Sequence, residues 1–150
     1  MENYVTIIIA CVCAVAMAAS AVIYLRHRAR RNVPDEFDLM EGHDFEYYCA
    51  ELLKKCGFHE VEVTRGSGDY GVDILAEKEG VTYAIQCKCY SAQVGVKAVQ
   101  EAYAGRDYYD RMVGAVLTNQ YFTQPAMEAA KKLKILLWDR GYLEDMLEEP

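Results

Sequence analysis

Three polar side chains near the middle of the chain have the types and spacing for metal-assisted chemistry. Asp73, Gln86 and Lys88 offer a carboxylate, an amide and an amine. A carboxylate and a neighbouring oxygen can hold a divalent cation, which polarises a phosphate and lowers the pKa of a bound water. A nearby lysine can orient that water, assist its deprotonation or neutralise charge on the phosphorus. A solvated hairpin with ordinary surface polar residues is the alternative, because a D…QxK spacing by itself recurs by chance.

A β-hairpin must bring these groups together. Residues 72–76 and 81–88 alternate apolar and polar side chains and are rich in β-branched residues, which predicts two strands. Glu79 and Gly80 lie between them and indicate a tight turn.

The turn also predicts a register. If the hairpin is symmetric about Glu79-Gly80, Asp73 lies opposite Gln86 and Leu75 lies opposite Ala84. Opposed residues place their side chains on the same face of a sheet. Lys88 follows Gln86 by two residues, so it projects from that face as well.

Several separated motifs around this hairpin resemble one nuclease family. In order they are GSGDYGVDILAEKEG, YAIQCKCY, VGVKAVQEAYAG and GAVLTNQYFTQPAMEAA. Together they resemble the Mrr-type restriction endonuclease domain, a branch of the PD-(D/E)XK nuclease superfamily, over residues 35–147. The resemblance implies that Asp73 is the metal-binding aspartate and Lys88 the catalytic lysine. Gln86 stands where the wider superfamily has Glu or Asp, as is usual in the Mrr branch, and implies a weaker oxygen ligand for Mg²⁺, with Mn²⁺ as a substitute.

The same resemblance implies further site residues. Glu46 matches a glutamate of the first helix that binds metal, although a first-turn acid also complements a helix dipole. Ser67, Gly68 and Asp69 belong to a glycine-rich loop that borders the scissile phosphate, or that forms only a structural turn. Gln100 matches a glutamine near the active site, and is otherwise a surface residue.

The remaining elements follow from hydrophobic periodicity and from turn residues. Helices are predicted at residues 42–56, 94–109, from 123 onward and at 141–147, and further strands at 59–64, 112–118 and 135–138. The order αβββαβαβα predicts an α/β fold with a PD-(D/E)XK core and an αβα-type extension.

The amino-terminal segment has a different composition. Residues 4–25 contain no charged side chain, and a helix of that length spans about 33 Å, close to the hydrocarbon core of a bilayer. No Lys or Arg precedes the apolar run, which favours an uncleaved transmembrane helix over a signal peptide. Arginines follow it directly and place the remainder in the cytoplasm by the positive-inside rule, namely Arg26, Arg28, Arg30 and Arg31.

The expected organisation is therefore a short extracytoplasmic end at residues 1–3, a single membrane span at 4–25, a basic juxtamembrane linker at 26–34 and the nuclease-like domain at 35–150. The localisation predicted is the cell membrane, with the amino terminus outside.

Charge argues against tight DNA binding. Residues 35–150 contain 12 lysines and arginines against 22 aspartates and glutamates, a net charge of −10, whereas affinity for DNA comes largely from cations that neutralise phosphates. The only dense basic cluster is Lys131, Lys132 and Lys134, and the cations expected near the site are Arg65, Lys88 and Lys97.

Two functions remain in view. The first is a membrane-anchored, Mg²⁺-dependent endonuclease that acts on double-stranded DNA in restriction or DNA processing, with a homodimer as one possible assembly. The second is a catalytically weak or inactive nuclease-like module that acts as a nucleic-acid-binding or membrane scaffold protein.

Overall fold

The computed structural model describes residues 15, 17–22, 36–65, 68 and 70–148. The chain divides into two units, Met1–Asp35 and Glu36–Pro150. In the first unit Val15 and residues 17–22 are helical and exposed. Most of the predicted span at residues 4–25, and all of the following arginines, lie outside the described residues. Within the described ranges, no helix combines the length and apolar character needed to cross a bilayer.

The second unit is built on a five-stranded mixed sheet in the order β1-β2-β3-β4-β5. The hairpin strands β2 and β3 are antiparallel, as are β1 and β2, whereas β3, β4 and β5 are parallel. The strand bounds are His59–Val63 for β1, Ile74–Lys78 for β2, Val81–Lys88 for β3, Val113–Thr118 for β4 and Ile135–Trp138 for β5.

The predicted hairpin register is confirmed. Leu75 pairs with Ala84, and the backbone N–H of Asp73 donates to the carbonyl of Ile85 just beyond the end of β2. Glu79 and Gly80 have φ values of 52° and 77°, the conformation that two-residue hairpin turns require. This turn therefore fixes which residues of β2 and β3 share a face.

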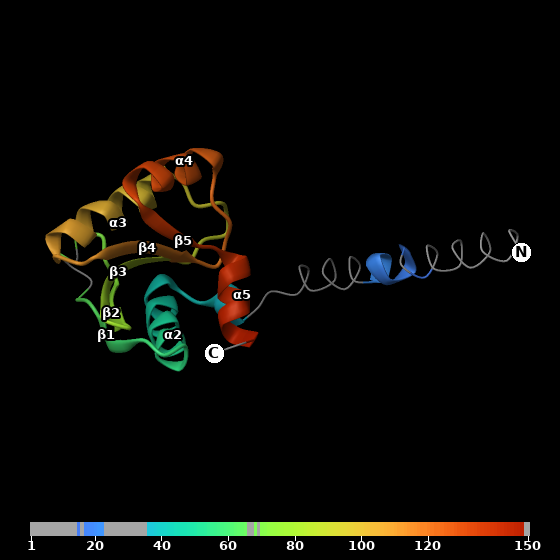
Figure 1. Cartoon of the computed structure of the whole chain (residues 1–150), viewed down its shortest axis with the longest axis horizontal. Helices are drawn as coiled ribbons and strands as arrows, with labels where there is room; N and C mark the ends of the chain where they lie inside the picture. Colours follow the sequence, from blue (N-terminus) through green and yellow to red (C-terminus); the bar gives the residue numbers. More distant parts are fainter. Residues whose placement is uncertain (1–14, 16, 23–35, 66–67, 69, 149–150) are drawn as a thin grey trace, which may run out of the picture. The chain divides into compact units, whose positions relative to one another are not determined.

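Helices cover both faces of the sheet, with α3 and α4 on one face and α2 and α5 on the other (Figure 1). They are α2 at Gly42–Lys55, α3 at Val96–Tyr108, α4 at Gln124–Leu133 and α5 at Arg140–Glu148. The predicted order of helices and strands is confirmed, with boundaries that differ by one or two residues in most elements. One element was missed: residues 36–39, for which no helix or strand was predicted, form the 3₁₀ helix η1 (Glu36–Leu39), where Phe37 is buried at 2% exposure.

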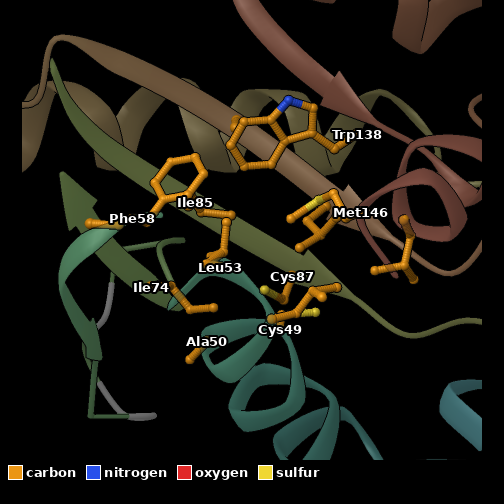
Figure 2. Close-up of a cluster of buried hydrophobic side chains, with 14 of the residues drawn as sticks. Cys49, Ala50, Leu53, Phe58, Ile74, Ile85, Cys87, Trp138 and Met146 are labelled. Carbon is orange, nitrogen blue, oxygen red and sulfur yellow. The ribbon is translucent and has the colours of Figure 1, made fainter. Parts of the chain in front are cut away.

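Each face of the sheet has its own apolar core. Leu53 of α2, Ile85 and Cys87 of β3, and Trp138 of β5 meet in the first core, with Met146 of α5 beside them (Figure 2). Fully burying one such aliphatic side chain contributes about 1.5–3 kcal/mol. Because successive strand residues face opposite sides, burial of Cys87 in this core turns its neighbours in β3 toward the α3 face.

A polar network closes the carboxyl ends of β3 and β4. The buried amide of Asn119 accepts from the Tyr90 N–H at 2.9 Å and donates to the Tyr90 carbonyl at 3.1 Å. The same amide nitrogen donates to Asp38 Oδ1 at 3.0 Å. The guanidinium of Arg140 donates hydrogen bonds to both carboxylate oxygens of Asp38, at 2.8 and 2.9 Å. The network therefore joins η1, both strand ends and the start of α5 next to the site described below.

Candidate active site

A pocket of about 340 Å³ lies at the carboxyl end of β3. Its polar lining comes from Glu46 of α2, Asp73 just before β2, Gln86 and Lys88 of β3, and Glu101 of α3. Residues from α2, from the β2–β3 hairpin with its preceding segment, and from α3 thus meet at the carboxyl end of the central strand. The rest of the lining is Gly42, Gly71, Cys87, Cys89 and Tyr90.

The carboxylate and the amide predicted to converge do so. Asp73 and Gln86 are both buried, and the amide nitrogen of Gln86 donates to Asp73 Oδ2. The backbone N–H of Cys87 donates to the same oxygen at 2.6 Å. These two donors fix the orientation of the buried carboxylate, and charge-assisted hydrogen bonds of this kind are among the strongest in proteins.

The contact with Asp73 also decides which way the Gln86 amide faces. A carboxylate only accepts hydrogen bonds, so it is the NH₂ group of Gln86, and not its oxygen Oε1, that contacts Asp73 Oδ2. Oε1 is buried and receives no hydrogen bond from any residue that the structure describes. A buried acceptor without a partner lowers the stability of the fold by about 1–3 kcal/mol. Binding of a donor or a cation to Oε1 would recover this free energy.

The oxygen atoms of Asp73 and Gln86 suit a hard cation that needs few ligands from the protein. Carboxylate and amide oxygens are ligands of Mg²⁺, which typically takes one or two carboxylates and completes its shell with water and substrate oxygens. Among the described side chains, His, Cys, Asp and Glu form no group of three or more able to hold a metal ion. A metal in this pocket would therefore use Asp73 together with the amide oxygen of Gln86.

Lys88 lies on the same side of β3 and is largely buried. Its amine is 2.9 Å from Glu101 Oε2. Burial by itself would lower the pKa of Lys88, but the hydrogen bond and the charge of Glu101, followed by Tyr90 and Asp73, outweigh it and raise the pKa above its ordinary value. The side chain is therefore a cation at neutral pH, suited to contact an anionic oxygen.

Glu46 also lines the pocket. Its carboxylate is 3.0 Å from Nδ1 of His43, one turn earlier in α2. The fold thus brings Glu46 to the site, and its predicted role as a metal ligand stays a prediction.

The helix α3 presents a different residue from the one expected. Gln100 is exposed and lies outside the pocket lining, whereas its neighbour Glu101 is part of it. Sequence reasoning overlooked Glu101, although a signal was present. The buried stripe of α3 includes Ala98, Ala102 and Gly105, and a glutamate at 101 lies three and four residues from two of these, on the same side of the helix.

The glycine-rich loop is described only in part. Ser67 and Asp69 lie outside the described residues. Gly68 is exposed and adopts a φ of 85°, a left-handed conformation that glycine adopts readily. The predicted roles of all three in substrate binding stay predictions.

The basic cluster of the sequence is far from the pocket in the fold. Lys134 directly precedes β5, and β5 runs parallel to β4 and β3. Lys131, Lys132 and Lys134 therefore lie at the amino end of these strands, opposite the edge that carries Lys88. Near the pocket, Lys88 and Lys97 both pair with Glu101, at 2.9 and 3.6 Å, so the local positive charge is partly neutralised.

The fold is shared with solved structures, among them two restriction endonucleases. A protein of unknown function, AF1548, is 24% identical with a TM-score of 0.61, covering 72% of this chain and 66% of its own. The DNA modification-dependent restriction endonuclease AspBHI is 21% identical with a TM-score of 0.54, over 69% of this chain. The MspJI restriction endonuclease, solved in complex with a 27-mer oligonucleotide, is 19% identical with a TM-score of 0.55, over 86% of this chain. The chain spans only 30% of the length of each restriction endonuclease.

No protein with a curated description matches the sequence significantly. A family model does: residues 37–147 match the model described as Mrr_cat, restriction endonuclease. That match covers most of the chain, including both hairpin strands and every pocket residue named above. The chain therefore belongs to the Mrr_cat restriction endonuclease family.

Proposed function

We propose that this chain is a divalent-metal-dependent DNA endonuclease of Mrr type, with a PD-(D/E)XK-like site that hydrolyses phosphodiester bonds. Membership of the family supports the reaction class. The observation that carries the proposal is the meeting of Asp73, Gln86 and Lys88 in one pocket, with the Gln86 amide oxygen buried and unsatisfied by any described residue.

Each of the three side chains has a distinct task. Asp73 and the amide oxygen of Gln86 would hold Mg²⁺ or Mn²⁺, with Glu46 as a further oxygen ligand. The bound ion would polarise the scissile phosphate and lower the pKa of the attacking water. The amine of Lys88 contacts a non-bridging phosphate oxygen, where a positive charge stabilises the charge that develops as the phosphorus gains a fifth ligand.

Double-stranded DNA is the proposed substrate. One relative in fold was solved with an oligonucleotide and another is named for modification-dependent restriction. Because the chain spans 30% of each and carries a net charge of −10 over residues 35–150, we expect weak DNA binding by this domain alone. Cleavage of both strands in one binding event would use two such sites, which is the reason to expect a homodimer on the substrate.

Replacing Lys88 with methionine should lower the rate of cleavage steeply while leaving the fold intact. Methionine fills the space of the lysine stem but removes the positive charge, so the phosphate loses its cationic partner. The full chain, purified in detergent, should nick supercoiled plasmid with Mg²⁺ or Mn²⁺ and stop when EDTA is added. Loss of one charged stabilising group lowers a rate by about 100–1000-fold, measurable by gel electrophoresis. Undiminished nicking by Lys88→Met would refute the role of the amine.

A nuclease-like module without activity is the second candidate, favoured by the acidic surface and by the position of the lysine cluster opposite the pocket. The two functions differ in metal binding. An endonuclease should show a Mg²⁺ site by calorimetric titration in the millimolar range or below when DNA is present. If Mg²⁺ gives no heat of binding either with or without DNA, the inactive nuclease-like module is the better account.

We also propose that residues 4–25 anchor the enzyme in the cell membrane, with the amino terminus outside and the catalytic domain in the cytoplasm. The uncharged run and the arginines after it support this arrangement. The full chain should remain in the membrane fraction after washing with alkaline carbonate, and a chain lacking residues 1–34 should be released. Recovery of the full chain in the carbonate supernatant would contradict the anchor.

A further inference from the structure

Glu101 is a charged residue beside the proposed catalytic lysine that no part of the proposed reaction uses. Its carboxylate is 2.9 Å from the amine of Lys88, and both side chains are largely buried, at 28% and 19% exposure. Lys97 lies 3.6 Å from the other carboxylate oxygen but is 87% exposed. Water screens an exposed pair strongly, so Lys88 is the principal partner of Glu101.

The backbone holds Glu101 in a fixed place. Gly71, at the end of the glycine-rich loop, has a φ of 81°, and a Cβ added there would lie 2.8 Å from the Cβ of Glu101. Four residues along α3, a Cβ on Gly105 would lie 2.2 Å from Cγ2 of Val72 and 2.9 Å from the Tyr70 carbonyl. The segment that leads into Asp73 is therefore packed directly against the turn of α3 that carries Glu101.

Lys88 needs such a partner. A lysine side chain has four flexible carbons and a compact charge, and the pocket also contains the carboxylates of Asp73 and Glu46. Without Glu101, the amine of Lys88 would pair with Asp73, the group proposed to hold the cation. A charge-assisted hydrogen bond to Glu101 keeps the amine on the α3 side and leaves Asp73 to the metal.

We infer that Glu101 is a positioning residue, which holds the amine of Lys88 at the scissile phosphate and away from Asp73. This inference rests on the proposed endonuclease function. It assigns no direct contact with substrate to Glu101, which acts only through Lys88.

The test compares Glu101→Gln with Glu51→Gln in the full chain. Glu51 also pairs with a lysine, Lys54 at 2.7 Å, but on the exposed surface of α2, so this control removes an equal charge away from the pocket. Two quantities are measured: the NMR signal of the Lys88 NH₃⁺ group, assigned by its absence in Lys88→Met, and the steady-state cleavage of a DNA duplex with Mg²⁺.

An ordered amine should give a resolved signal in the wild type and in Glu51→Gln, and the signal should be lost in Glu101→Gln. The kcat of Glu101→Gln should fall about 100-fold, the effect of a reactive group misplaced by roughly an ångström, with KM for DNA unchanged. Glu101→Asp, which keeps the charge but shortens the side chain, should recover part of both the signal and the rate. The double variant with Lys88→Met should be no slower than Lys88→Met alone, because residues that act as one unit are not additive.

A resolved Lys88 signal in folded Glu101→Gln would overturn the inference, whether or not its kcat falls. So would a double variant clearly slower than Lys88→Met alone. If Glu101→Gln does not fold, the comparison rests on Glu101→Asp, in which an amine signal and a rate equal to wild type would overturn it. If the wild type itself does not cleave DNA, the endonuclease proposal fails, and the amine signal still decides whether Glu101 holds Lys88.

Discussion

Replacing Asp73 with asparagine is expected to eliminate DNA cleavage and Mg²⁺ binding while the protein stays folded. Asparagine keeps an oxygen that accepts from the Cys87 N–H and from the Gln86 amide, the two contacts that fix Asp73 in the structure. It removes the only negative charge of the proposed Asp73–Gln86 ligand pair. Loss of a partner outside the ligand shell weakens metal binding by about 10–100-fold, so loss of the ligand itself should exceed this.

The stability change of Asp73→Asn should be small. Hydrogen bonds to a charged acceptor are stronger than those to a neutral one by about 1 kcal/mol, which sets the expected loss in the free energy of unfolding. Alanine is a poorer choice, because it would leave the buried Cys87 N–H without its acceptor. Calorimetric titration with Mg²⁺ and a plasmid assay on the same sample provide the check. Wild-type metal affinity in Asp73→Asn would exclude Asp73 as a ligand.

Replacing Arg140 with alanine is expected to cause the largest loss of stability among these variants. Arg140 grips both oxygens of Asp38 and donates to the Asn119 carbonyl at 3.1 Å, and its side chain is 12% exposed. Its removal leaves the largely buried carboxylate of Asp38 without its cation, a loss of about 3 kcal/mol. For a domain of this size, such a loss lowers Tm by roughly 10 °C.

Lys54→Ala is the matched control for Arg140→Ala. It breaks an exposed ion pair with Glu51 on α2, which contributes at most about 1 kcal/mol. Thermal unfolding followed by circular dichroism compares the two. Equal melting temperatures for the two variants would show that the Asp38–Arg140 contact does not hold η1 against the ends of the sheet.

The hairpin and its register follow from local sequence. Glu79-Gly80 defines a two-residue turn, and the period of two in each strand leaves one pairing that buries Ile74 and Ile85 together. The register set by this turn then predicts that Asp73, Gln86 and Lys88 project from the same face of the hairpin. The order of the other elements follows as well, because each strand and helix has its own hydrophobic period.

Other features depend on contacts between distant parts of the chain. Residues 36–39 are too short a segment to show a hydrophobic period, and the burial of Phe37 and the pairing of Asp38 with Arg140 make them an ordered helix. Which residue of α3 reaches the pocket depends on how the helix is rotated over the sheet. Small residues at Ala102 and Gly105 set that rotation, and it brings Glu101 rather than Gln100 to Lys88.

Crystals of the wild-type domain grown with Mn²⁺ give the most direct test of the central claim, because the ion is located by its anomalous scattering. We expect a single strong peak in the pocket, about 2.1 Å from a carboxylate oxygen of Asp73 and from Oε1 of Gln86, with the amine of Lys88 beside Glu101. A peak coordinated by other residues, or a pocket in which Gln86 Oε1 turns away from the ion, would contradict the account.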